Sequence, residues 1–234
     1  MSASRTARER VRAELTEEIT GLARRQLATE GAAGLSLRAV AREMGMASSA
    51  IYRYFASRDD LLTALIIDGY NAVGEAVERA DAALPRDDHR GRWLAVCRAV
   101  RDWAVTHPHE YALLYGSPVP GYQAPEDTIG PALRDTAVYV RIVADAHAAG
   151  TLRPHEPGPV PANLEADLAR ARTTIGADLP DEVIVRALTV WAALFGTVSF
   201  EVFGQFDNVI GERAAYFDHT MGVLASFAGF PAEG

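Results

Sequence analysis

The feature that most constrains this chain is a glycine placed after a short helical pattern and before a second one. Leu37, Val40, Ala41 and Met44 recur at positions i, i+3, i+4 and i+7, which is the spacing of one face of an α-helix. Gly45 follows directly and can adopt the positive φ that turns a chain sharply after a helix. Two short helices joined by such a turn predict a helix-turn-helix.

The second helical pattern, over residues 48–55, has two faces of different chemistry. At 100° per residue, Ile51 and Phe55 share one face, and we expect them to pack on the neighbouring helices. Ser49, Tyr52 and Arg53 point the other way, and Ser48 lies on the flank. Small residues at a helix start allow close approach to DNA, arginine can pair with guanine, and tyrosine can reach phosphate. The spacing alone leaves two interpretations open: a DNA-reading helix, or an unrelated helical hairpin with exposed aromatic residues.

Helical patterns and breaks continue along the rest of the chain. Residues 57–60, Ser-Arg-Asp-Asp, resemble a capping box, and Ser36 is a candidate N-cap for the helix before Gly45. We expect helices to about residue 84 and then over 89–106, 127–149, 162–175, 181–205 and 212–227, with Gly- and Pro-rich loops at 116–131 and 152–161. The predicted fold is all-α, with an N-terminal three-helix helix-turn-helix domain (1–60) joined by a long helix to a larger helical bundle (61–230).

Charge and composition narrow the function further. The net charge is −8, yet residues 1–65 hold ten arginines and eight acidic residues, which leaves this part at +2. The basic start of the chain is either a patch that faces phosphates or a solvated terminus. A single cysteine, Cys97, excludes an internal disulfide framework. Without a secretory signal, and with no apolar run of about 18 residues, we expect a cytoplasmic protein that does not bind membranes.

Signals for catalysis or metal binding are sparse. His107 and His109 alternate near Glu110 and could hold a metal, but Pro108 marks a helix break and no second ligand cluster follows. The chain lacks the nucleophile-elbow, Walker A and dinucleotide-binding glycine motifs. Cys97 lies in an apolar stripe and is expected to be a packed thiol. We therefore expect no catalytic residues, no metal and no cofactor.

Residues 34–62, GLSLRAVAREMGMASSAIYRYFASRDDLL, resemble the DNA-binding domain of the TetR family of bacterial transcriptional regulators. The matching positions are Ser36, Gly45, Tyr52, Tyr54, Phe55, Arg58, Leu61 and Leu62. The resemblance implies phosphate contacts from Ser36, Arg38, Tyr52, Tyr54 and Arg58. It implies base contacts from Ala47, Ser48, Ser49, Ala50 and Arg53. Position 47 departs from the pattern, because many members have a capping Ser or Thr there, which leaves Ser48 as the alternative cap.

Two later segments resemble the regulatory domain of an actinobacterial subgroup: DWAVTHPHEYALLYGSPVPGY (102–122) and WAALFGTVSFEVFG (191–204). The family implies an effector pocket inside the bundle and a homodimer formed by the last two helices. Four aromatic residues either line that pocket or belong to the core: Trp103, Tyr111, Tyr115 and Tyr122. Five residues are assigned to the dimer interface or core in preference to a ligand site: Trp191, Phe195, Phe203, Phe217 and Met221.

The resemblance therefore implies a sequence-specific DNA-binding regulator. It would be a homodimeric repressor that binds a near-palindromic double-stranded operator and responds to an unidentified small-molecule effector. Two alternatives remain at this stage: a helix-turn-helix protein that acts through a protein partner, and an enzyme of unknown class.

Overall fold

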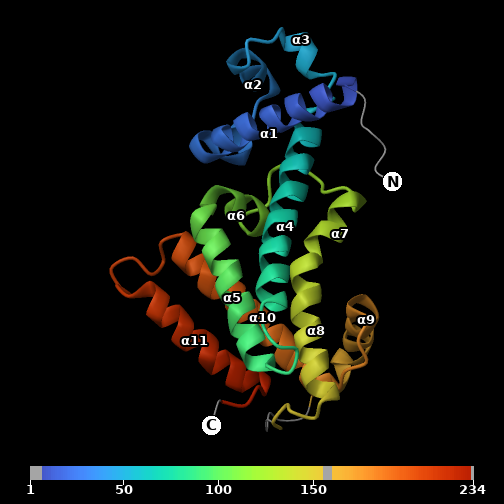
Figure 1. Cartoon of the computed structure of the whole chain (residues 1–234), viewed down its shortest axis with the longest axis vertical. Coiled ribbons are helices and arrows are strands. Elements are labelled where there is room, and N and C mark those ends of the chain that lie inside the picture. Colours follow the sequence, from blue (N-terminus) through green and yellow to red (C-terminus); the bar gives the residue numbers. More distant parts are fainter. Residues whose placement is uncertain (1–6, 155–159, 233–234) are drawn as a thin grey trace. The chain divides into compact units, whose positions relative to one another are not determined.

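The computed structural model describes residues 7–154 and 160–232, and every regular element in these ranges is helical (Figure 1). The prediction of an all-α fold is thus confirmed. In chain order the elements are α1 (Ala7–Gly34), α2 (Leu37–Glu43), α3 (Ser48–Ile51), α4 (Arg58–Ala82), α5 (His89–Thr106), α6 (Pro108–Tyr115), the 3₁₀ helix η1 (Glu126–Thr128), α7 (Ile129–Ala132), α8 (Arg134–Ala148), the 3₁₀ helix η2 (Ala162–Leu164), α9 (Glu165–Ile175), α10 (Asp181–Val202) and α11 (Arg213–Ala228).

Contacts between residues divide the chain into two compact units. The first unit combines Met1–Tyr70 with His107–Pro131, and the second combines Asn71–Thr106 with Ala132–Gly234. Helix α4 contributes its first part to one unit and the remainder to the other. The predicted division into a DNA-binding domain (1–60) and a bundle (61–230) is functional rather than geometric, and it stays a prediction.

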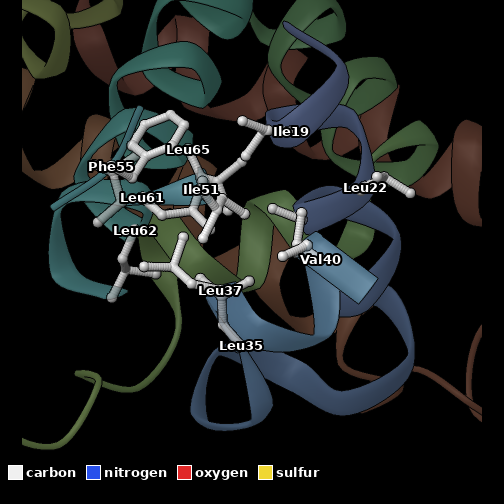
Figure 2. Close-up of a cluster of buried hydrophobic side chains, with 13 residues drawn as sticks. Ile19, Leu22, Leu35, Leu37, Val40, Ile51, Phe55, Leu61, Leu62 and Leu65 are labelled. Carbon is white, nitrogen blue, oxygen red and sulfur yellow. The ribbon is translucent and has the colours of Figure 1, made fainter. Parts of the chain in front are cut away.

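The core of the first unit joins α1, α2, α3 and the start of α4. Figure 2 shows Ile51 and Phe55 beside Leu61, Leu62 and Leu65 of α4, and all five side chains are buried. Helix α1 contributes Ile19, Leu22 and Ala23, and α2 contributes Leu37, Val40 and Ala41. Partly buried apolar residues of the later segment pack against the same cluster, namely Leu113, Leu114, Val119 and Tyr122. Ile51 and Phe55 are thus buried in one cluster with residues of the neighbouring helices, as predicted.

The core of the second unit is built around Trp93 of α5. Its side chain is fully buried, and its indole Nε1 donates a hydrogen bond to the carbonyl of Met221 at 3.2 Å. The Trp93 ring lies 5.0 Å from that of Tyr139 and 6.4 Å from that of Phe230. Because these partners come from α8, α11 and the residues after α11, one aromatic side chain holds several helices together.

A buried ion network lies in the same unit. Asp81, only 2% exposed, accepts hydrogen bonds from Arg92 at 2.7 Å, Arg141 at 2.8 Å and Arg86 at 3.2 Å. Arg92 is itself fully buried and also donates to Asp145 at 2.9 Å. Burial alone would raise the pKa of Asp81, but hydrogen bonds from Arg92 and Arg141 outweigh it and lower the pKa.

Helix α10 departs from one sequence expectation. By length and composition it could cross a bilayer, although no such run was expected. It instead packs beside α11 and α5 (Figure 1), and it carries Glu201, which binds Arg101 of α5 through hydrogen bonds of 2.7 and 2.6 Å. Only a third of its most apolar stretch is buried, so Leu188 and Phe200 are about half exposed.

The segment over 116–131 is less irregular than its composition predicts. We expect a loop there from its Gly and Pro content, but η1 and α7 occupy the last part. Pro125 precedes η1, and its carbonyl accepts a hydrogen bond from the Thr128 hydroxyl at 2.7 Å. The acidic residues Glu126 and Asp127 lie in the first turn, where negative charge favours a helix start.

Candidate nucleic-acid interface

The turn between α2 and α3 forms for local reasons that the sequence contains. The Ser36 hydroxyl caps α2 by accepting from the Ala39 amide at 3.4 Å, while the Ser36 amide donates to the buried Gln26 side chain at 3.0 Å. At the other end, Gly45 has φ of 65°, and the next amide, that of Met46, donates to the Ala41 carbonyl at 2.8 Å. The predicted N-cap and glycine turn are both present.

Helix α3 is shorter than the segment 48–55 predicted from its periodicity. It ends at Ile51, whose carbonyl accepts from the amides of both Tyr54 at 2.9 Å and Phe55 at 3.1 Å. Ala47 occupies the N-cap position with no side-chain cap, and Ser48 is the first helical residue. The suggestion that Ser48 replaces the missing cap is therefore wrong. Helical turns nevertheless continue past Ile51, because the Arg53 amide also donates to the Ala50 carbonyl at 3.2 Å.

The surface around α3 is polar and exposed. Ile51 and Phe55 are buried, whereas Ser48, Ser49 and Arg53 are exposed and Tyr52 is 43% exposed. We call these four exposed residues the α3 strip. Of the other residues expected at the bases, Ala47 is exposed and Ala50 is partly buried. Arg38 of α2, expected at a phosphate, is also exposed.

An arginine-lined groove lies next to the α3 strip. The Arg12 guanidinium lies 5.4 Å from the centre of the Tyr54 ring and donates from Nη2 to the Arg53 carbonyl at 3.1 Å. The groove has a volume of about 510 Å³ and is lined by Arg8, Val11, Arg12, Arg53 and Tyr54. A cation over an aromatic ring and a hydrogen bond to the adjacent carbonyl both restrain the end of the α3 segment.

Arg8 and Arg12 were not among the predicted site residues. Their signal in the sequence is the i, i+3, i+4 spacing of Arg8, Val11 and Arg12 on one face of α1. The excess of arginine near the N-terminus was visible, but its position against Tyr54 depends on how α1 crosses the later turn. Tyr54 itself is partly buried and packs against the core of the first unit.

Two residues expected at phosphates have structural partners inside the protein. Arg58 donates from Nε to the Leu35 carbonyl at 3.2 Å and from Nη2 to the Ala32 carbonyl at 2.6 Å. It thereby joins the start of α4 to the turn between α1 and α2, just beyond the bend at Gly31, where φ is 68°. Ser36 caps α2, as described above. Neither arrangement tests whether these residues also touch DNA.

The four aromatic residues proposed for an effector pocket are divided between the two units of the chain, and their role at a pocket stays a prediction. Trp103 belongs to the second unit, and the three tyrosines belong to the first. Trp103 and Tyr111 are buried, and the rings of Tyr111 and Tyr115 lie 5.0 Å apart. The Tyr122 hydroxyl is 2.8 Å from the Thr63 hydroxyl. These contacts give each of the tyrosines a packing role in the first unit.

The residues expected at a dimer interface also fall into two groups. Phe217 and Met221 are buried inside the protomer and form part of its own core. Trp191 and Phe195 are partly buried, with ring centres 5.3 Å apart, and Phe203 is exposed. Further apolar side chains are exposed on α10 and α11, namely Leu188, Phe200, Tyr216 and Val223. An apolar surface of this kind therefore exists on the last two helices, although it is made partly by other residues.

Metal binding and thiol chemistry have little support in the described part of the chain. Among those residues, no cluster of three or more His, Cys, Asp or Glu side chains is arranged to hold a metal. Glu110, which follows the two alternating histidines, lies 3.4 Å from Arg24. Cys97 is buried, and burial raises the pKa of its thiol well above the usual value, so the thiolate is disfavoured.

Comparisons with known proteins agree with this geometry. Residues 19–65 match the model for bacterial regulatory proteins of the tetR family, and residues 93–224 match the model for a tetracyclin repressor-like C-terminal domain. The HTH-type transcriptional regulators Rv1816 of Mycobacterium tuberculosis and Mb1846 of Mycobacterium bovis are each 44% identical over 216 residues, which cover 92% of this chain and 90% of each relative.

Solved structures are similar over nearly the whole chain as well. A crystal structure of the regulatory protein SCO4313 is 35% identical, with a TM-score of 0.77 over 94% of this chain and 100% of that one. A protein from Rhodococcus sp. RHA1 is 26% identical, with a TM-score of 0.67 over 92% of this chain and 93% of that one. Both units are therefore covered by these likenesses.

Proposed function

Since this chain belongs to the TetR family of bacterial transcriptional regulators, we propose that it is a ligand-responsive repressor that acts as a homodimer on a near-palindromic operator. The observation that carries the proposal is the α3 strip. Its polar side chains face solvent while Ile51 and Phe55, on the same short segment, are locked into the core. A rigidly held, exposed polar segment after a glycine turn is what a recognition element requires.

Within this strip, base reading and phosphate binding are assigned to different residues. Ser48, Ser49 and Arg53 are exposed at the start and end of α3, where arginine can make bidentate contacts with guanine. Tyr52 and Arg38 are assigned to phosphates. Arg8 and Arg12 extend the positive surface beside them, which supports attraction to the DNA backbone. Arg58 is assigned a positioning role, because two backbone carbonyls already accept its hydrogen bonds.

Residues 61–230 are assigned to dimerisation and effector binding. The protein is proposed to act in the cytoplasm. Exposed apolar side chains on α10 and α11 support a second copy of the chain as the partner of this face. A twofold dimer would present two recognition elements to successive major grooves, about 34–36 Å apart. An effector that favours a different spacing would weaken DNA binding by shifting the population of conformations.

The test is selection of preferred sites from a random-sequence duplex library by the full-length protein. We expect a near-palindromic site whose half-sites lie about one helical turn apart. The Arg53→Ala variant should lose preference at one position per half-site, with each lost contact reducing discrimination by about 5- to 150-fold. Enrichment of no site by the wild-type protein would refute the proposed function, and an unchanged site with Arg53→Ala would refute only the role given to Arg53.

A further inference from the structure

The arginine-lined groove beside the α3 strip carries positive charge that the protein itself does not compensate. Arg8, Arg12 and Arg53 line it, and no carboxylate in the described part of the chain pairs with any of the three. Elsewhere in the first unit arginine does find such a partner, since the Arg24 guanidinium lies 2.7 Å from the Asp68 carboxylate. The groove therefore presents unpaired charge to a group from outside the protein.

Two arginines of the groove differ in how free they are to bind. Arg12 donates from Nη2 to the Arg53 carbonyl at 3.1 Å, and its guanidinium lies 5.4 Å from the centre of the Tyr54 ring, so its position is fixed. Arg8 lies one helical turn earlier on the same face of α1 and is exposed. It forms no hydrogen bond or ion pair with another described residue. Arg8 can therefore bind a second molecule without breaking a contact of its own.

The position of the groove indicates the class of its occupant. Arg53 belongs both to the groove and to the α3 strip, so the groove borders the surface assigned to the bases. The major groove of B-DNA is about 12 Å wide and a helix with its side chains is about 10–12 Å across, so a surface directly beside an inserted helix meets the sugar-phosphate backbone. Each strand carries one phosphate per about 3.4 Å of axis. An apolar occupant is disfavoured, because it would remove water from unpaired guanidinium groups.

We propose that this groove binds a phosphodiester of the operator backbone, with Arg8 donating to the phosphate and Arg12 acting as a positioning residue beside it. The inference rests on the proposed function, and it adds the start of α1 to the surface that contacts DNA. Since a phosphate carries no base identity, Arg8 contributes affinity for every sequence and preference for none.

The experiment measures binding of the full-length protein to its selected duplex by fluorescence anisotropy at several salt concentrations. Arg8→Ala removes one phosphate contact from each protomer of the dimer, so the dependence of log K on log salt should become less steep by about 1.8. The dissociation constant should rise about 2- to 30-fold, as expected for two exposed ion pairs. A random duplex should lose affinity by the same factor, and Arg8→Lys should keep the wild-type slope because it keeps the charge.

Arg10→Ala is the matched control. Arg10 is also an exposed arginine of α1, but it does not line the groove. Its replacement removes the same charge without a phosphate contact, so the slope should stay within about 0.5 of the wild-type value. Equal changes of slope in Arg8→Ala and Arg10→Ala would overturn the inference, because the effect would then come from net charge alone.

A second measurement locates the contact on the DNA. Single phosphates of each half-site are replaced in turn by uncharged methylphosphonates. One replacement should weaken binding of the wild type and leave binding of Arg8→Ala unchanged, because the variant no longer uses that phosphate. If every replacement weakens both proteins equally, the groove does not bind the backbone through Arg8.

Phosphate from another source is tested by comparing potassium phosphate with potassium chloride at equal ionic strength. Both salts should weaken DNA binding equally. Stronger competition by phosphate in the wild type, but not in Arg8→Ala, would assign the groove to a free phosphate compound and overturn its assignment to DNA. A wild-type protein that binds no duplex refutes the proposed function, whereas DNA binding that is unchanged in Arg8→Ala refutes only this inference.

Discussion

Replacing Arg12 by lysine should weaken DNA binding even though it preserves the positive charge. The guanidinium of Arg12 spans two partners, the Tyr54 ring at 5.4 Å and the Arg53 carbonyl at 3.1 Å. A lysine ammonium is a point charge that can satisfy one of them at a time. The end of the α3 segment would then be less ordered before DNA arrives, and binding would include the cost of ordering it.

The size of the effect follows from the contact that is lost. An exposed cation–π contact contributes about 0.5–1 kcal/mol, and a hydrogen bond contributes about 0.5–1.5 kcal/mol. Loss of one of them predicts a loss of about 1 kcal/mol per protomer, or about 2 kcal/mol for a bound dimer, which raises the dissociation constant about 30-fold. Arg12→Ala loses both contacts and the charge, so it should weaken binding further.

Fluorescence anisotropy over a range of salt concentrations separates the loss of ordering of the α3 segment from the loss of positive charge. Arg12→Lys should shift the whole binding curve while the dependence of log K on log salt keeps its slope. Arg12→Ala should also reduce the slope by about 1.8 if Arg12 neutralises one phosphate in each protomer of the dimer. Arg10→Lys, at an exposed position on the same helix, is the matched control and should behave as the wild type. If Arg12→Lys binds as tightly as the wild type at every salt concentration, the positioning role of Arg12 is refuted.

Two further predictions concern the second unit. Asp81→Asn should lower the free energy of unfolding in urea by about 3–5 kcal/mol, because it leaves the buried Arg92 without its main counter-charge. Glu75→Gln, in the exposed pair with Arg79, should change it by less than about 1 kcal/mol. Equal effects of the two substitutions would contradict this reasoning. The pKa of Asp81 is lowered in the folded state, so the ionised carboxylate stabilises the fold fully above the unfolded-state pKa of about 3.9. This stabilisation disappears as the pH falls through the lower folded-state pKa. Asp81→Asn should therefore make the free energy of unfolding depend less on pH in the acidic range. Phe200→Glu, at a 52% exposed position of α10, should convert the dimer into a monomer in sedimentation at micromolar concentration. Val105→Glu, at a 47% exposed position of α5, should leave the dimer intact, and a dimeric Phe200→Glu variant would place the interface elsewhere.

Features set by neighbouring residues could be predicted from the sequence. The Ser36 cap, the Gly45 turn and the bounds of α5 follow from local chemistry and periodicity, and all are present. The burial of Ile51 and Phe55 also follows, because two side chains on one face of a helix point toward the same neighbouring helices.

Features set by distant residues could not be predicted in the same way. The contact between Arg12 and Tyr54 and the hydrogen bonds from Arg58 to the turn after α1 depend on how helices cross. The apolar pattern of α10 and α11 does not say which side chains a neighbouring helix covers. Phe217 therefore lies in the protomer core while Phe200 is exposed, although both look equally apolar in the sequence.

The discontinuity of the first unit also has a consequence for synthesis on the ribosome. Its core residues on α1 to α4 emerge early, yet Leu113, Leu114, Val119 and Tyr122, which pack against that core, belong to the segment His107–Pro131. At about 5–20 residues per second, the ribosome needs about 3–12 s to extend from residue 70 to residue 131. During that interval the nascent DNA-binding helices expose apolar surface that a chaperone can bind, so the unit completes its folding well after its own recognition element has been made.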